Sequence, residues 1–191
     1  MTDKREKLKR LLTQLSFKYS DTPIFPLTSG KMSNFYIDCK MTTLYSKAMP
    51  LIGELVFEKI KSLKIQGLGG LTLGADPIAY AAAMFAGHKD VEINSFVIRK
   101  EPKKHGLKKW IEGGIKRGDR VVIIEDVITT GGSTIQAIDK AEESGLEIVK
   151  IIILVDREEG GIENITKKGY EAESLFKKSE LLEEFKRINE V

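Results

Sequence analysis

Hydrophobic positions alternate between strand-like and helix-like spacing along most of the chain. Segments 121–124 and 151–155 are continuously apolar, as are strands covered on both faces. Strands are predicted over 65–70, 92–99, 120–126, 147–156 and 171–176, and helices over 76–87, 132–144, 161–168 and the remaining C-terminal residues. Because strands alternate with helices, the pattern predicts an α/β fold with a central, mostly parallel sheet flanked by helices.

The first 42 residues follow a different pattern. Leucines at helical spacing predict an amphipathic helix over 3–17, and two short segments around Gly30 predict a hairpin or a pair of strands. Ser46 is then placed to cap a further helix that has Pro50 in its first turns. We expect residues 1–42 to form an N-terminal helix and hood, and residues 43–191 to form one compact core.

The amino-acid composition excludes some classes of protein. The 191 residues include 31 Lys and Arg against 28 Asp and Glu, so the net charge of +3 lacks the basic footprint of a nucleic-acid binder. The N-terminus is charged, and no apolar run approaches the roughly 20 residues that cross a bilayer, so we expect a cytoplasmic protein. The single cysteine, Cys39, is interpreted as a small buried hydrophobic residue.

Segment 99–114 joins two predicted strands without an obvious helix and carries six Lys or Arg residues. Long loops in compact domains are uncommon and are often functional. The alternative is a solvated run of charge. The residues of segment 99–114, taken alone, do not decide between a functional loop and a solvated run of charge.

The most informative segment is 121–134, where a predicted buried strand ends in Glu125 and Asp126 and turns through Gly131 and Gly132 into a helix. Ligands of open parallel sheets bind at this carboxyl end. Glycines let backbone amides converge, and hydroxyls and the helix N-terminus offer donors to an anion. The turn therefore predicts a cradle for a phosphate monoester, with a tight turn and helix cap as the alternative.

Two acids in contact with a phosphate would repel it, because unit charges 4 Å apart interact by about 4 kcal/mol at an effective dielectric near 20. A neutral group is therefore expected between the acids and the phosphate. A ribose 5-phosphate meets this requirement if its hydroxyls donate to Glu125 and Asp126. The same carboxylates could stabilise positive charge that develops at C1. Segment 67–74 lacks the third glycine of a dinucleotide motif, and the chain has no P-loop motif.

Segment 121–134 resembles the signature of type I phosphoribosyltransferases, in which apolar residues, two acids and a T-x-G-x-T/S turn bind phosphoribosyl pyrophosphate. Segments 25–38 and 99–106 resemble the hood and the catalytic loop of the members that use orotate. Segment 69–79 stands where the family keeps its pyrophosphate loop, and Arg157 matches the position of a base-contacting arginine.

The resemblance implies the type I phosphoribosyltransferase fold and a pentosyltransferase of pyrimidine biosynthesis that joins orotate to phosphoribosyl pyrophosphate with Mg²⁺. It implies a homodimer with shared active sites. It assigns catalysis to Lys103 and Asp126, and orotate binding to Thr129 and Arg157, with no residue assigned to the metal. The residues it assigns to phosphoribosyl pyrophosphate are Arg99, Lys100, Lys103, His105, Glu125, Asp126, Val127, Ile128, Thr129, Thr130, Gly131, Gly132 and Ser133.

Several alternatives stay open. The chain could be a transferase of the same fold that uses a purine or uracil, or a regulator that lost catalysis and binds nucleic acid. Trp110 could anchor the base of the 99–114 loop or pack in the dimer interface, and Tyr36 could be a wall beneath the base or a core residue. Many family members carry lysine where this chain has Thr28 and Leu73, and His88 is expected at the surface near a helix C-terminus.

Overall fold

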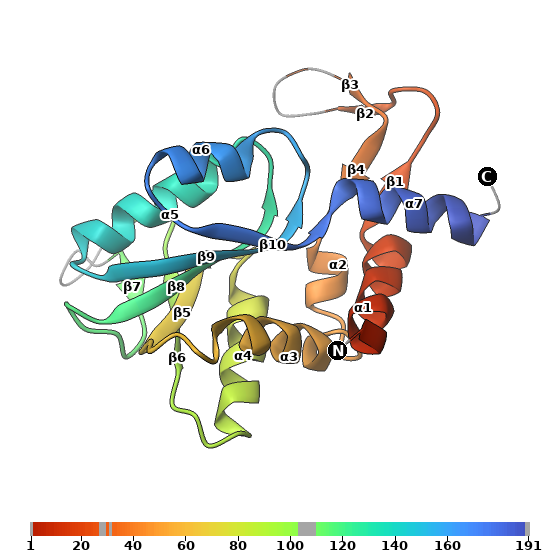
Figure 1. The fold of residues 1–191 in the computed structure, drawn as a ribbon. Coiled ribbons are helices and arrows are strands. Elements are labelled where there is room, and N and C mark those ends of the chain that lie inside the picture. Colours follow the sequence, from red (N-terminus) through yellow and green to blue (C-terminus); the bar gives the residue numbers. More distant parts are fainter. Residues whose placement is uncertain (1, 27–29, 31, 103–109, 190–191) are drawn as a thin grey trace.

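A central six-stranded sheet organises the molecule (Figure 1). The computed structural model describes residues 2–26, 30, 32–102 and 110–189. Its strands are β5 (Gly67–Leu71), β6 (Asn94–Ile98), β7 (Ile111–Glu112), β8 (Arg120–Ile128), β9 (Glu147–Asp156) and β10 (Ala172–Lys177). They lie in the order β10-β9-β8-β5-β6-β7, with every pair parallel except β6 and β7. The predicted mostly parallel sheet is confirmed.

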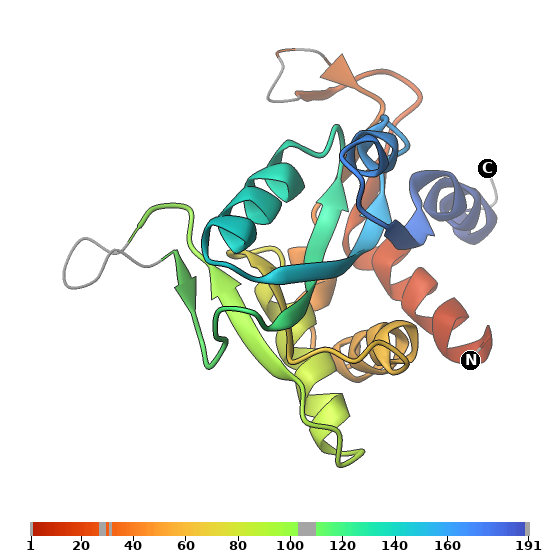
Figure 2. The same ribbon diagram turned by 60° about the vertical axis from the view of Figure 1, so that its left-hand side comes forward.

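Helices cover both faces of the sheet. One face packs against α3 (Met49–Ile60) and α4 (Asp76–Gly87), and the other against α5 (Gly132–Glu143), with α6 (Gly161–Lys167) beside α5. Figure 2 shows the same separation from a second direction. Because side chains alternate along a strand, Val122 and Ile124 of β8 join the first core, whereas Val121 and Ile123 join the second.

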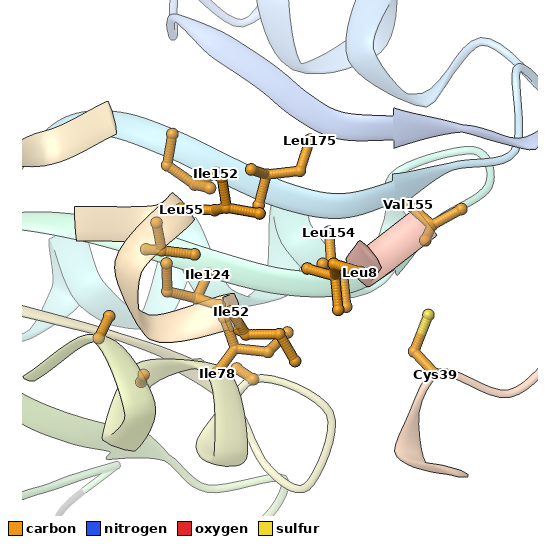
Figure 3. Packing of buried hydrophobic residues seen from close by; sticks show 14 of the residues in the cluster. Leu8, Cys39, Ile52, Leu55, Ile78, Ile124, Ile152, Leu154, Val155 and Leu175 are labelled. Atoms are coloured by element: carbon orange, nitrogen blue, oxygen red, sulfur yellow. The ribbon is translucent and has the colours of Figure 1, made fainter. Parts of the chain in front are cut away.

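The N-terminal region shares the first of these cores. Leu8 and Leu12 of α1 (Thr2–Leu15) are fully buried in the same cluster as Ile152 and Phe176, and α1 also packs against α7 (Lys178–Asn189). Figure 3 shows Leu8 and Leu154 in this cluster, together with Ile52 and Leu55 of α3 and the sheet residues Ile124 and Ile152. The division of the chain at residue 42 stays a prediction.

The hood consists of short antiparallel pairs. Strand β1 (Phe17–Tyr19) pairs with β4 (Phe35–Ile37), and β2 (Phe25–Pro26) pairs with β3 (Met32–Ser33). The chain then enters the single-turn helix α2 (Lys40–Thr43). In Figure 2 the arrows of β8 and β9 point toward the side of the molecule where β2 and β3 lie. The hood therefore stands over the carboxyl ends of the parallel strands.

Three local predictions were wrong. Ala48, and not Ser46, is the N-cap of α3, because the chain already turns through Tyr45, whose carbonyl oxygen accepts hydrogen bonds from the next residues at the helix start. Strand β8 continues to Ile128, so the two acids lie inside the strand and not at its end. The predicted loop 99–114 contains β7, which exists by pairing with β6.

Within the described ranges, no helix is both long and apolar enough to cross a membrane.

Candidate active site

The turn from β8 into α5 is held by its backbone. Gly131, the N-cap of α5, has a φ of +90°, a conformation that glycine adopts at little cost. The start of α6 packs against this turn: Asn164 donates from Nδ2 to the Thr130 carbonyl oxygen over 3.0 Å, and a Cβ on Gly161 would overlap the Thr129 carbonyl oxygen. No side chain of the described residues caps α5, so its exposed start at Gly132 presents N–H groups to an anion.

Glu125 faces α5. It is 7% exposed, and its Oε2 accepts a hydrogen bond of 2.8 Å from Oγ1 of Thr134, in the first turn of that helix. Burial, and then the neighbouring Asp126 charge, raise the pKa of Glu125 to about 8. At neutral pH this carboxyl therefore favours its protonated form, and it can donate as well as accept a hydrogen bond.

Asp126 is directed away from α5, because successive strand residues alternate in direction, but it lines the same pocket as Glu125 and its charge helps to raise the pKa of that residue. Its half-buried carboxylate lies against Gly74, in the loop between β5 and α4, and a Cβ at Gly74 would overlap it. The glycine at this position thus lets the loop approach the acid without displacing its carboxylate.

A pocket of about 250 Å³ brings several predicted residues together. Lys100, Glu125, Asp126 and Ser133 line it, along with residues 71–74. Lys40 of α2, which was not predicted as a site residue, also lines it. The pocket therefore joins the C-terminal half of β8, the start of α5, the 71–74 loop and the segment that follows the hood.

Other predicted residues are not in this lining. Arg99 lines a neighbouring pocket of about 360 Å³ with Lys100, and its Nη1 lies 3.3 Å from Oε1 of Glu112. Lys103 and His105 are outside the described residues, as is Thr28. Their predicted roles stay predictions.

Arg157 follows β9 and lies under the hood. Its side chain is buried, with the guanidinium carbon 4.8 Å from the centroid of the Phe35 ring and Nη2 2.9 Å from Oε1 of Glu159. Among the described residues, its buried Nε finds no hydrogen-bond acceptor. A buried guanidinium with unused donors, beside an aromatic ring, is suited to a planar anion.

The structure also shows where the other residues considered in the sequence lie. Cys39 is fully buried, which confirms its packing role, and His88 is an exposed C-cap of α4, as predicted. Tyr36 is 43% exposed and its ring stacks on Phe25, so the core interpretation was wrong. Nζ of Lys140 lies 4.1 Å from the Trp110 ring centroid, an arrangement that anchors the base of the 99–114 loop to α5.

The oxygen donors of the pocket suit Mg²⁺ that arrives with its substrate. The described residues contain no group of three or more His, Cys, Asp or Glu side chains arranged to hold a metal. Asp126 nevertheless offers a carboxylate at the pocket wall, the hard ligand that Mg²⁺ prefers. The site fits an ion held mainly by phosphate oxygens and water, with one carboxylate beside it.

Comparison with known proteins identifies the family. The model described as "Phosphoribosyl transferase domain" matches residues 74–177. Orotate phosphoribosyltransferase of Aquifex aeolicus is 49% identical over 178 residues, which cover 93% of this chain and 97% of that protein. The chain belongs to the orotate phosphoribosyltransferase family.

Solved structures of this family share the fold. Orotate phosphoribosyltransferase of Mycobacterium tuberculosis H37Rv in complex with Fe(III) dicitrate is 34% identical, with a TM-score of 0.80 and coverage of 93% of this chain and 98% of that one. The same enzyme in complex with 5-phospho-alpha-D-ribosyl 1-diphosphate is 30% identical, with a TM-score of 0.74 and coverage of 94% and 92%. The predicted family and fold are confirmed.

Proposed function

We propose that this chain transfers the ribose 5-phosphate group of phosphoribosyl pyrophosphate to orotate, giving orotidine 5-phosphate and pyrophosphate in pyrimidine synthesis. The observation that carries the proposal is the pocket in which Asp126 and the start of α5 meet, in a chain that matches orotate phosphoribosyltransferases over nearly its whole length. The rival functions have no comparable support.

The phosphate end of the substrate is assigned to the turn 129–133, where backbone N–H groups and the exposed Ser133 hydroxyl can donate to phosphoryl oxygens. The ribose hydroxyls then lie toward Glu125 and Asp126. Glu125, with its raised pKa, holds a hydroxyl without adding a full charge near the phosphate. Asp126 supplies negative charge to the ribose ring.

The chemical step forms a bond between N1 of orotate and C1 of the ribose and breaks the bond from C1 to the diphosphate oxygen. The electron pair of the broken bond leaves with the diphosphate, and the N1 proton of orotate passes to solvent. The Asp126 carboxylate stabilises the positive charge that develops on the ring as the C1 bond lengthens. Asp126 would lie beside Mg²⁺ held by the substrate phosphates, and the ion would supply positive charge to the leaving group.

The orotate ring is assigned to the space beneath the hood. Its carboxylate would accept hydrogen bonds from Arg157, whose Nε is buried and has no acceptor among the described residues. Thr129, at the start of the phosphate turn, is also assigned to the orotate ring, since it follows Ile128, whose carbonyl oxygen accepts a hydrogen bond of 3.0 Å from the backbone N of Arg157. The predicted loop residues Lys103 and His105, with Arg99 and Lys100, are assigned to the departing diphosphate. Lys103→Ala is expected to lower turnover far more than it weakens ribose-phosphate binding.

The direct test is a spectrophotometric assay of orotate consumption with phosphoribosyl pyrophosphate and Mg²⁺. A panel of adenine, hypoxanthine, guanine and uracil, assayed under the same conditions by product formation, serves as the control. We expect product with orotate alone. If the chain instead gave product with a purine or with uracil, that base would be its substrate. If no base gave product, the proposed enzymatic function would be rejected.

The proposal includes a homodimer with shared active sites. Leu73, Tyr80 and Met84 are exposed apolar residues at the 71–74 loop and along one face of α4, so a second copy seated there would adjoin the pocket. If each loop acts in the partner's site, Lys103→Ala and Asp126→Asn chains co-refolded in equal amounts should regain about a quarter of wild-type activity, because about half of the dimers are mixed and one of the two sites in each mixed dimer is intact. A monomer in sedimentation, or no recovery, would contradict the shared sites.

The proposal also places the enzyme in the cytoplasm. The chain has one cysteine, and Cys39 is buried, as suits a reducing compartment. Fractionation of cells that express the chain, followed by the orotate assay on each fraction, tests this part.

A further inference from the structure

The charges around the pocket are unevenly distributed. The 71–74 loop forms one wall with leucine, threonine and glycine residues and supplies no cation. Lys40 and Lys100 are the cations that line the pocket in the part of the chain that the structure describes. A diphosphate carries several negative charges, so this wall needs positive charge from outside its own loop.

Lys40 is held in place on both sides. Asp38, after the hood strand β4, accepts a hydrogen bond from the Lys40 backbone N over 3.2 Å and lies 2.6 Å from its Nζ. Cys39 before it and Thr42 after it are fully buried, and Thr42 Oγ1 lies 2.6 Å from the buried Ser16 Oγ. The exposed ammonium of Lys40 thus stands on a backbone fixed against α1.

The surroundings of Lys40 keep it charged. Its hydrogen bond to Asp38 raises the pKa of Lys40, and the charges of Asp38 and Asp126 and the Tyr36 hydroxyl add to this effect against the opposing effect of burial. A lysine ammonium has three donors, and Asp38 takes one of them. The other donors are available to a ligand in the pocket beside Asp126.

We propose that Lys40 binds the diphosphate of phosphoribosyl pyrophosphate, and the pyrophosphate released from it, from the side of the pocket opposite the phosphate turn. The proposal rests on the proposed function. Ser133 and Lys40 both line the pocket, but Ser133 begins the helix that covers one face of the sheet, whereas Lys40 follows Cys39, which is buried in the core on the other face. A substrate with its 5-phosphate in the turn therefore directs its C1 substituent toward Lys40. Asp38 acts as the positioning residue that holds the ammonium there.

The test measures binding of three probes to the full chain by calorimetry with Mg²⁺ present: phosphoribosyl pyrophosphate, pyrophosphate and orotidine 5-phosphate, which has no diphosphate. Lys40→Met should weaken the first two about 10- to 100-fold, the loss of one charge-assisted hydrogen bond. It should leave orotidine 5-phosphate within about twofold. Lys40→Arg should restore most of the affinity, because it restores the charge.

The matched control is Lys47→Met, which removes an exposed lysine that does not line the pocket. It should leave all three affinities unchanged, and thermal unfolding of each variant checks that it folds. Unchanged diphosphate affinity in Lys40→Met would mean that Lys40 only pairs with Asp38. Equal weakening of all three probes would mean that the ribose site itself has shifted, and either result overturns the inference.

The same measurements separate this inference from the proposed function. If the wild-type chain binds phosphoribosyl pyrophosphate but consumes no orotate, the proposed function fails and the Lys40 comparison still decides the inference. If the wild-type chain binds neither phosphoribosyl pyrophosphate nor pyrophosphate, both fail.

Discussion

The two faces of strand β8 present neighbouring acids to very different surroundings. On the α5 face, Glu125 is buried, bonded to Thr134, and its pKa is raised to about 8. On the α4 face, Asp126 is half-buried beside Gly74 and within the electrostatic reach of Lys40. One residue of separation thus divides a buried acid whose pKa is raised from a half-buried acid that lies near a lysine.

The difference extends beyond the acids. The α5 side is built by backbone contacts, in which Gly131, Gly161 and the Thr130 carbonyl fix the shape of a turn. The α4 side is built by side chains from separate segments, which bring Lys40 and Asp126 to one pocket. In the proposed function, the first face would bind the phosphate through its backbone shape, whereas the second would control charge near the reacting carbon.

The largest expected effect compares the acids directly. Asp126→Asn should lower kcat/KM about 100- to 1,000-fold, because it removes charge that stabilises the transition state. Glu125→Gln should lower it about tenfold or less at pH 7, since the native carboxyl is already mostly neutral in its buried position. Steady-state assays with orotate measure both variants. Equal losses would break the distinction between the two faces.

A second prediction compares alanine substitutions at two glycines, one packed against backbone and the other against the Asp126 carboxylate. In Gly161→Ala the added Cβ meets the Thr129 carbonyl and the Ile128 side chain, so urea unfolding should show a loss of about 2–3 kcal/mol. In Gly74→Ala the Cβ meets only the Asp126 carboxylate among its three nearest atoms. That flexible group can rotate, so stability should fall by under about 1 kcal/mol while kcat/KM falls with the displaced acid. The reverse order of stability losses would contradict the assignment.

The smallest effect concerns stability against pH. The folded pKa of Glu125 lies near 8 against an ordinary value of 4.5, so the unfolded chain releases this proton first, and the native protein loses stability as pH rises from about 4.5 to 8. Glu125→Gln has no such loss. It should be more stable than wild type by about 1–2 kcal/mol at pH 8.5, and the difference should vanish below pH 4.5. Urea unfolding across this range is the measurement, and a pH-independent difference would show that burial does not shift the acid.

Much of the fold could be predicted from local patterns. The helix over 76–87 and the strand over 147–156 have the predicted bounds, because their spacing and their flanking turn residues are sufficient signals. Strand β7 could not be found this way, since two residues carry no period and the strand exists through its pairing with β6. Helix α2 has only four residues, and its position depends on contacts with α1, such as the hydrogen bond from Thr42 Oγ1 to the Leu11 carbonyl oxygen.

The site was predictable where it is contiguous. Residues 125–133 could be read as one ligand-binding turn, because a strand, two acids and a glycine bend follow each other directly. Lys40 was missed because its charge resembles that of any surface lysine until α2 is packed. A single exposed lysine between the buried Cys39 and Thr42 becomes a signal only when burial is known.

The sequence by itself determined the alternating strands and helices, the glycine turn into α5 and the presence of two acids before it. Spacing, glycine content and residue chemistry act over a few neighbouring positions, so these features need no knowledge of distant contacts. The tertiary structure decided which acid is buried, where Arg157 meets the hood and which lysine faces the pocket. Those properties depend on desolvation and on charges from remote segments, which only packing brings within reach of one another.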